Sequence, residues 1–264
     1  MEDNLDRAKS FIVSLSKQEN EISKNKNTSI VEFLTKKKTK KDKNNLEKLR
    51  DVGITHSWIT NFLNNENVSL DLSSGYHSWE ECCAGLLSPN YVQRFFNLSK
   101  NNVGAGEFLI MMLALRIGKK ASNPSNGQGG DIIIDGINYE IKGNYGRLDG
   151  TQIDDVADII DNHKQWGFQI DTEDTADGSN KFPSIQTREN NLVNAFISAF
   201  FNGRNKSGKL LVVNTEGYYV IEKGQKITDG RIKITIPGWM RYYAYTKTVS
   251  PHNDNDRTIK ISLL

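Results

Sequence analysis

The segment DIIIDGINYEIK, residues 131–142, constrains the fold more than any other part of the chain. Two β-rich runs flank the dipeptide Asp135-Gly136, and Asp-Gly between alternating apolar residues is the strongest short signal for a β-hairpin. A two-residue turn at this dipeptide would place Asp131 directly across the ladder from Glu140. The sequence therefore predicts an antiparallel hairpin over this segment.

The alternation of side chains along a strand assigns the two faces of the hairpin. One face is expected to enter the core, and it carries Ile132, Ile134, Ile137, Tyr139 and Ile141. The other face carries Asp131, Asn138, Glu140 and Lys142. Its two carboxylates would repel each other by roughly 3 kcal/mol at ~5 Å and an effective dielectric constant of about 20. Such a pair needs solvent, a proton or a cation to neutralise it.

Two carboxylates beside a main-chain carbonyl are hard oxygen ligands suited to Mg²⁺ or Mn²⁺. Lys142 stands two residues after Glu140 on the same face, where it could orient a water molecule beside the metal. The pattern therefore indicates a divalent-metal site on Asp131 and Glu140. A surface hairpin whose polar face happens to carry these residues is the alternative.

Gly130-Asp131, followed after eight residues by Glu140-Ile141-Lys142, resembles the signature of the PD-(D/E)xK nuclease superfamily, which has the restriction-endonuclease-like fold. In that signature an Asp lies on one strand and a (D/E)xK triplet on the next, and the preceding helix often contributes an acid. Glu107, in the run VGAGEFLIMMLAL, matches that acid. Gly130 replaces the usual Pro, and residues 118–130 leave little room for the usual first strand. The resemblance covers residues 103–222.

The resemblance implies metal-dependent hydrolysis of phosphodiester bonds. Asp131, Glu140, the carbonyl of Ile141 and, as a further ligand, Glu107 would bind Mg²⁺, with Mn²⁺ as a substitute. Lys142 would orient the attacking water and offset the charge that builds on the phosphate. We therefore expect a magnesium-dependent DNA endonuclease whose catalytic residues are Asp131, Glu140, Lys142 and Glu107, although the residues alone do not distinguish DNA from RNA.

A second function class stays open beside the nuclease. It is a non-catalytic protein that reuses the nuclease fold for assembly or nucleic-acid binding, for example in a phage particle. The unfavourable carboxylate pair favours the enzyme, because an inert protein has no need to retain it.

The remaining pattern predicts an α/β (α+β) chain with a mixed sheet flanked by helices over residues 101–264, and the resemblance implies that this sheet has the restriction-endonuclease-like fold. A mainly helical, basic region is expected over residues 1–100. Helices are expected over 106–118 and 188–201, and strands over 210–213, 218–222 and 231–236. Residues 149–177 carry nine acids against one lysine, a local charge of −8. This acidic segment is expected to be a solvated loop, with a flap or an autoinhibitory element as the alternative.

The first hundred residues carry a concentrated positive charge. Residues 24–50 contain ten Lys or Arg against three acids, a local charge of +7, and such a run can follow phosphates by charge alone. Its candidate nucleic-acid ligands are Lys36, Lys37, Lys38, Lys40 and Lys41. A solvated tail is the alternative. Residues 49–63 resemble the turn and second helix of a helix-turn-helix, and an ordinary helical hairpin is the alternative there.

Composition and motif order exclude several other classes. No apolar run approaches the roughly 18 residues of a membrane span, and the N-terminus lacks the order of a secretory signal. Together with the adjacent Cys82 and Cys83, which form neither a disulfide framework nor a zinc site, this predicts an intracellular protein, bacterial or phage-encoded. Residues 203–209 spell most of a P-loop, but Leu210 replaces the required Ser or Thr, so no nucleotide cofactor is expected. DNA is the expected partner, and cutting both strands would commonly need two copies of the chain.

Overall fold

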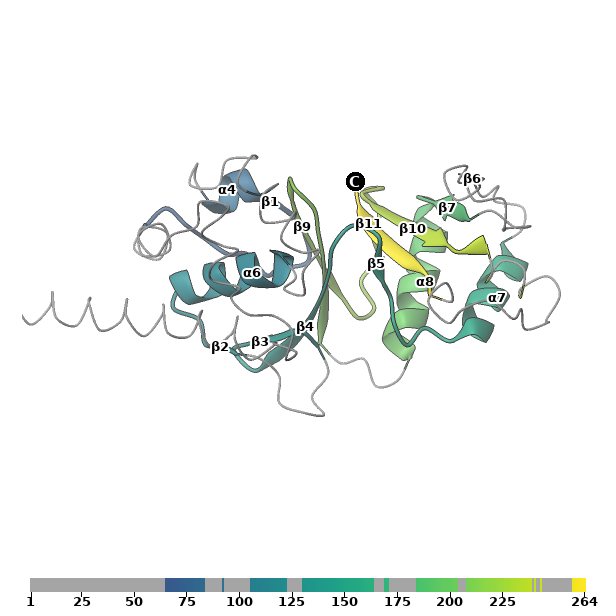
Figure 1. The fold of residues 1–264 in the computed structure, drawn as a ribbon, viewed down its shortest axis with the longest axis horizontal. Coiled ribbons are helices and arrows are strands. Elements are labelled where there is room, and N and C mark those ends of the chain that lie inside the picture. The colour runs from purple at the N-terminus through teal and green to yellow at the C-terminus, as the bar shows by residue number, and fades with distance from the viewer. Residues whose placement is uncertain are drawn as a thin grey trace, which may run out of the picture. The chain divides into compact units, whose positions relative to one another are not determined.

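The computed structural model describes residues 65–83, 92, 105–122, 130–163, 169–170, 184–203, 208–238, 240, 243 and 258–264. Within these residues the chain is a mixed α/β protein (Figure 1). Its elements in chain order are β1 (Gly75–Ser78), α4 (Trp79–Cys83), α6 (Ala105–Arg116), β2 (Ala121–Ser122), β3 (Ile132–Ile134), β4 (Ile137–Lys142), β5 (Gly146–Arg147), α7 (Ile153–Asn162), β6 (Gln169–Ile170), β7 (Ile185–Thr187), α8 (Asn190–Asn202), β8 (Lys209–Val213), β9 (Gly217–Glu222), β10 (Ile232–Ile236) and β11 (Lys260–Leu263).

The strands form two sheets. The first has six strands in the order β1-β9-β8-β4-β3-β2, and it is mixed because β8 pairs antiparallel with β9 but parallel with β4. The second has five strands in the order β5-β11-β10-β7-β6, and all its pairs are antiparallel. The predicted α/β class with a mixed sheet is confirmed, whereas the second sheet was not predicted.

Most of the expected elements occur close to their predicted bounds: α6, β3, β4, α8, β8, β9 and β10. Among the described residues of the segment before the hairpin, the two-residue strand β2 is a short first strand, in keeping with the little room expected there. The described residues before position 100 contain β1 as well as the short helix α4. The predicted domain boundary near residue 100 and the segment 49–63 lie outside the described residues.

The acidic segment contains a helix, so the expectation of a plain solvated loop is wrong for residues 153–162. In α7 the residues Val156, Ala157 and Ile160 are buried, and together with Ile153 they recur at the spacing of one helical face. The intervening Asp154, Asp155 and Asp158 are exposed. The many acidic residues of this segment outweighed the helical spacing of its apolar residues, so the amphipathic helix was not predicted.

The chain divides into two compact units, and the first comprises residues 1–71, 80–123 and 132–136. Its described core is α6, which packs against β2 and β3. The residues from Leu109 to Ala114 are at most 2 % exposed, so α6 is buried on all sides rather than along one apolar face. Gly118 ends the helix with a φ of +78°, a conformation that glycine adopts without strain.

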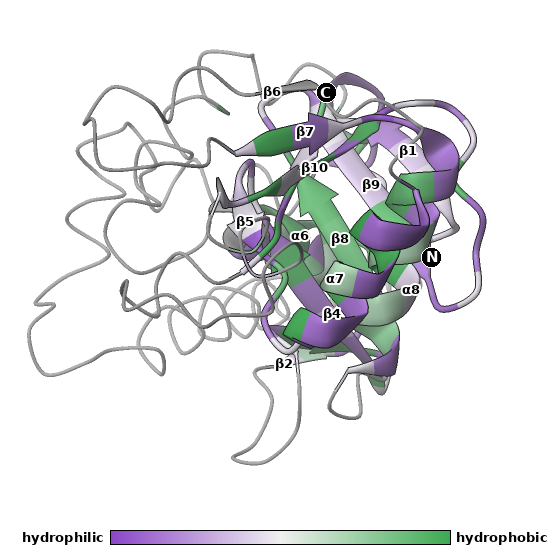
Figure 2. Cartoon of the chain, turned by 90° about the vertical axis from the view of Figure 1, so that its right-hand side faces the viewer, coloured by the Kyte–Doolittle hydropathy of each residue, from purple (hydrophilic) through white to green (hydrophobic). Residues whose placement is uncertain are grey.

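The second unit comprises residues 72–79, 124–131 and 137–264. Helices α7 and α8 share one hydrophobic core with β8, β10 and β11, centred on the buried rings of Phe196 and Phe200. After its first residue, Lys209, strand β8 is hydrophobic and buried (Figure 2), as expected for a strand covered on both faces. In the part of the chain that is described, no helix is long and apolar enough to cross a membrane.

Candidate functional site

The turn of the hairpin has the geometry that its sequence predicts. Asp135 and Gly136 have φ angles of 49° and 83°, the left-handed pair that a type I′ turn requires. A hydrogen bond from the Lys119 ammonium group, with the Lys120 amide also donating, holds the pKa of Asp135 below its usual value. The turn carboxylate therefore stays ionised and fastens the hairpin to the end of α6.

The apolar face of the hairpin enters the core with one exception. Ile132, Ile134, Tyr139 and Ile141 are at most 7 % exposed. Ile137, which the alternation placed in the core, is 43 % exposed because it directly follows the turn at the end of the hairpin. The core face thus begins two residues further along β4.

Asp131 lies just before β3 and departs from the regular ladder. Its main-chain N–H donates to the carbonyl oxygen of Tyr139 at 2.7 Å, where a two-residue hairpin would pair Tyr139 with Ile132. Gly130 has a φ of +94°, and a Cβ at this position would lie 3.0 Å from the same Tyr139 oxygen. The chain bends at this glycine, so Asp131 does not occupy the expected position directly across from Glu140.

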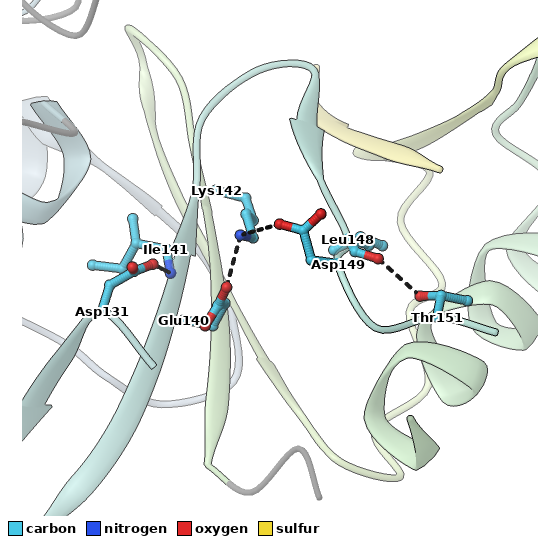
Figure 3. Close-up of polar contacts among 7 residues, drawn as sticks. All are labelled: Asp131, Glu140, Ile141, Lys142, Leu148, Asp149 and Thr151. Atoms are coloured by element: carbon cyan, nitrogen blue, oxygen red, sulfur yellow. Dashed lines mark hydrogen bonds and ion pairs between the residues drawn. The ribbon is translucent and has the colours of Figure 1, made fainter. Parts of the chain in front are cut away.

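The side chain of Asp131 makes the hydrogen bond to β4 that the main chain of a regular ladder would otherwise make. Its Oδ2 accepts a hydrogen bond from the main-chain N–H of Ile141 at 2.8 Å (Figure 3). Within an antiparallel pair, the N–H and C=O of one residue point to the same edge of the strand. The carboxylate of Asp131 and the carbonyl of Ile141 therefore lie on the same edge of β4.

Glu140 and Lys142 project from one face of β4, because residues two apart in a strand point the same way. The Nζ of Lys142 lies 2.7 Å from Oε1 of Glu140, and their side chains are 14 % and 21 % exposed respectively. Asp149, from the segment after β5, brings its Oδ2 to 4.0 Å from the same Nζ. The ammonium group thus lies between two carboxylates (Figure 3).

These contacts change the expected electrostatics of the site. Asp131 is held by a main-chain amide and Glu140 by Lys142, so the repulsion estimated for a bare carboxylate pair is largely offset. Three carboxylates against one ammonium nevertheless leave a formal charge of −2 on Asp131, Glu140, Asp149 and Lys142. A divalent cation would neutralise that excess.

Close packing of β5 holds Lys142 in this position. Gly146 lies against the lysine, and a Cβ there would come within 2.7 Å of the Lys142 Cβ and 2.7 Å of the Gly143 oxygen. Glycine is the residue that lets β5 approach the end of β4 this closely. The turn Gly143–Gly146, closed by a hydrogen bond between these two residues of 2.8 Å, brings Asp149 back to Lys142.

Gly146→Ala is expected to destabilise the protein by about 1–3 kcal/mol, because the added methyl group overpacks the contact with Lys142. The melting temperature should fall by about 2–4 °C for each kcal/mol in a chain of this size. Gly143→Ala is the matched control, since a Cβ there meets nothing within 4 Å. Equal melting of the two variants in a thermal denaturation experiment would contradict the close packing.

The donor chemistry of the site fits a magnesium ion. The carboxylates of Asp131 and Glu140 and the carbonyl of Ile141 are hard oxygen ligands of the kind that Mg²⁺ prefers. Among the described residues, no group of three or more His, Cys, Asp or Glu is arranged to hold a metal ion. Glu107 lies in the first turn of α6, in the first unit, whereas the other candidates belong to the second, and its role stays a prediction.

Sequence reasoning missed Asp149. It was counted only as one of the acids of residues 149–177. Its contact with Lys142 depends on the turn at Gly143–Gly146, and no periodic pattern in the sequence predicts that turn. Asn138 is half-buried on β4, and Gln152 donates weakly to the Gly150 carbonyl at 3.5 Å.

The basic candidates Lys36, Lys37, Lys38, Lys40 and Lys41 lie outside the described residues. Their role in nucleic-acid binding stays a prediction. No family model, curated protein or solved structure matches the chain, so the site rests on its own geometry and chemistry.

Proposed function

We propose that the chain is a Mg²⁺-dependent nuclease that hydrolyses the phosphodiester bonds of DNA. The observation that carries the proposal is the grouping of three features along β4. Asp131 is fixed on the Ile141 amide, Glu140 projects from the neighbouring position, and Lys142 lies beside Glu140. These are the residues on which the resemblance to PD-(D/E)xK nucleases rests.

The order of elements supports the same proposal. The resemblance implies a helix, a short first strand, a hairpin, a further helix and a strand. Along the chain these correspond to α6, β2, β3 with β4, α8 and β8, and β8 runs parallel to β4, with Glu140 opposite Leu210. Helix α7 and the short strands β5, β6 and β7 lie between β4 and α8 as additions to that order, and β10 and β11 follow it.

Each residue has a distinct part in the proposed reaction. Asp131, Glu140 and the carbonyl of Ile141 would hold the metal ion, and a bound divalent ion polarises a phosphate oxygen and lowers the pKa of its water. A carboxylate has two oxygens, so Glu140 can bind a metal through one oxygen and keep Lys142 on the other. Lys142 has three N–H donors, enough to contact Glu140, a water molecule and a phosphate oxygen together.

The test is a cleavage assay on supercoiled plasmid, linear duplex and single-stranded DNA, and on RNA, each with Mg²⁺, with Mn²⁺ and with EDTA. Cleavage of DNA that requires the metal and stops in EDTA is the expected result. Cleavage of RNA alone would correct the substrate. Intact substrates in every metal condition would contradict the proposal.

One observation favours the non-catalytic alternative, namely a nucleic-acid-binding protein with an inert site. The ion pair between Glu140 and Lys142, at 2.7 Å, satisfies both groups without a metal ion. That alternative predicts binding of DNA with no cleavage, and equal binding in Mg²⁺ and EDTA. The cleavage assay therefore separates the two functions.

A further inference from the structure

The second sheet has one apolar face and one basic face. Residues that pair directly across strands lie on the same face, so the register places Lys260 beside Arg147 on one side and Thr235 on the other. The next row joins Ser262 to Lys233. The opposite face enters the core through Ile232, Ile234, Ile261 and Leu263.

We call the polar side the basic face and define it as Arg147 of β5, Lys260 and Ser262 of β11, and Lys233 and Thr235 of β10. These three strands lie side by side in the order β5-β11-β10 (Figure 1). Arg147 is exposed, Lys233 and Lys260 are half-buried, and Ser262 and Thr235 between them are buried, so a ligand could reach the face only through Arg147 and the two lysines. Strands β5, β10 and β11 contain no Asp or Glu, so the charge of the basic face is uniformly positive.

Tyr145 stands at the edge of the basic face in an unusual conformation. Its φ is 59°, a left-handed value that is uncommon for an aromatic residue and costs free energy. Its N–H donates to Ser262 Oγ at 3.0 Å. The residue is 52 % exposed, and Lys233 Nζ lies 5.2 Å from the centroid of its ring. The backbone is therefore strained at Tyr145, the residue whose aromatic ring lies beside Lys233.

The basic face continues into the candidate site. Tyr145, Arg147 and Asp149 alternate along the segment of β5, while the intervening Leu148 is fully buried. Asp149 lies 4.0 Å from Lys142 Nζ, and Gly146 packs directly against Lys142. A strand of nucleic acid that follows the basic face would therefore arrive at the residues proposed to cut it.

We propose that the basic face binds single-stranded nucleic acid, with phosphates on Arg147, Lys233 and Lys260 and a base stacked on Tyr145. Cations that follow the backbone and an exposed ring that stacks on a base form the usual platform for single strands. In a duplex the bases are already stacked and paired, so the ring would have no such partner. If the chain is the proposed nuclease, this inference identifies single-stranded nucleic acid as its substrate. The binding itself does not depend on the nuclease function.

The test measures binding in EDTA, where no cleavage occurs, by fluorescence anisotropy with a labelled oligonucleotide of about 16 thymidines. Tyr145→Asn removes the ring and keeps a residue that tolerates a left-handed φ, and it should weaken binding by about 5- to 100-fold. Tyr145→Phe should restore wild-type affinity. Replacing Lys233 and Lys260 by Gln should lower the salt dependence by about 0.7 per lost phosphate contact.

The double variant Lys223→Gln, Lys226→Gln is the matched control, because both lysines are exposed in the same unit but lie on the turn after β9. It should bind as the wild type does. A thymidine oligonucleotide carrying 5-iodouracil should cross-link under ultraviolet light to the peptide that contains Tyr145. Cross-links confined to residues 24–50, or wild-type affinity in Tyr145→Asn, would overturn the inference.

The two proposals fail separately. A protein that binds single strands through Tyr145 but cleaves nothing with Mg²⁺ would overturn the nuclease function and support the basic face. A protein that cleaves DNA with Mg²⁺ while Tyr145→Asn and the lysine variants bind and cleave as the wild type would overturn the basic face alone. Equal affinity for duplex and single strands, unchanged by Tyr145→Asn, would likewise overturn it.

Discussion

Replacing Lys142 by Met is expected to lower the rate of Mg²⁺-dependent DNA cleavage by about 10²–10³-fold. The Nζ of Lys142 lies 2.7 Å from Glu140 and 4.0 Å from Asp149, in position to contact a water molecule and a phosphate beside these carboxylates. Methionine keeps an unbranched apolar stem, which matters because the lysine side chain is only 14 % exposed. Single-turnover rates on labelled DNA at saturating Mg²⁺ measure the effect.

A matched control exists in the first unit. Lys119 forms a more exposed ion pair of the same length with Asp135 in the hairpin turn, 2.7 Å, so Lys119→Met removes a lysine–carboxylate contact that involves none of the proposed catalytic residues. It should leave the cleavage rate unchanged. A wild-type rate in Lys142→Met would mean that the attacking water is prepared by another group, and it would remove Lys142 from the proposed mechanism.

Two substitutions of Asp131 are expected to separate its metal-binding role from its structural role. Asp131→Ala leaves the N–H of Ile141 without its acceptor and should destabilise the metal-free protein by about 1–3 kcal/mol. Asp131→Asn keeps an amide oxygen at the 2.8 Å contact with Ile141, so its metal-free melting temperature should stay close to that of the wild type. Thermal melting in EDTA measures both.

Metal should then distinguish the wild type from both variants. An ion that binds only the native state stabilises it by about 2.7 kcal/mol at a concentration 100 times its Kd, so Mg²⁺ should raise the melting temperature of the wild type. It should do little for Asp131→Asn or Asp131→Ala. Calorimetric titration with Mn²⁺ should likewise show binding in the wild type and none in Asp131→Asn. Equal stabilisation of Asp131→Asn would show that the metal, if bound, lies elsewhere.

The elements that could be predicted from sequence are those specified by local signals. Asp135-Gly136 determines the hairpin because few dipeptides accept left-handed φ angles at both positions. Helix α8 has apolar residues at helical spacing, strands β8 and β9 are nearly continuous apolar runs, and the packing of these elements agrees with both patterns. In these segments the local preference and the tertiary environment favour the same structure.

The position of Asp131 could not be predicted from alternation. The alternation rule assumes a regular ladder up to the end of the hairpin, and the ladder ends at Ile132 because Gly130 turns away with a positive φ. A glycine before a strand signals that such a bend is allowed, but not that it occurs. The direct carboxylate pair was therefore expected where the structure instead has a carboxylate bound to the Ile141 amide.

Contacts between residues that are far apart in the sequence could not be predicted either. Strand β11, at 260–263, pairs with β10 at 232–236 and with β5 at 146–147, and two-residue strands carry too little pattern to be recognised. Helix α7 was missed for a different reason, because its acids outweighed the spacing of Val156, Ala157 and Ile160. Asp149 was missed because it was counted with the same acidic segment, although its Oδ2 lies 4.0 Å from Lys142 Nζ.

The most direct test of the central claim, a metal-dependent nuclease site on Asp131 and Glu140, is the rate of DNA cleavage as a function of Mg²⁺ concentration. The wild type and Asp131→Asn should be compared at equal concentration after their folding has been matched by melting. The account predicts a rate that rises to saturation with Mg²⁺ in the wild type, falls to background in EDTA, and stays at background in Asp131→Asn. Equal rates in the two proteins, or no cleavage by the wild type at any Mg²⁺ or Mn²⁺ concentration, would contradict it.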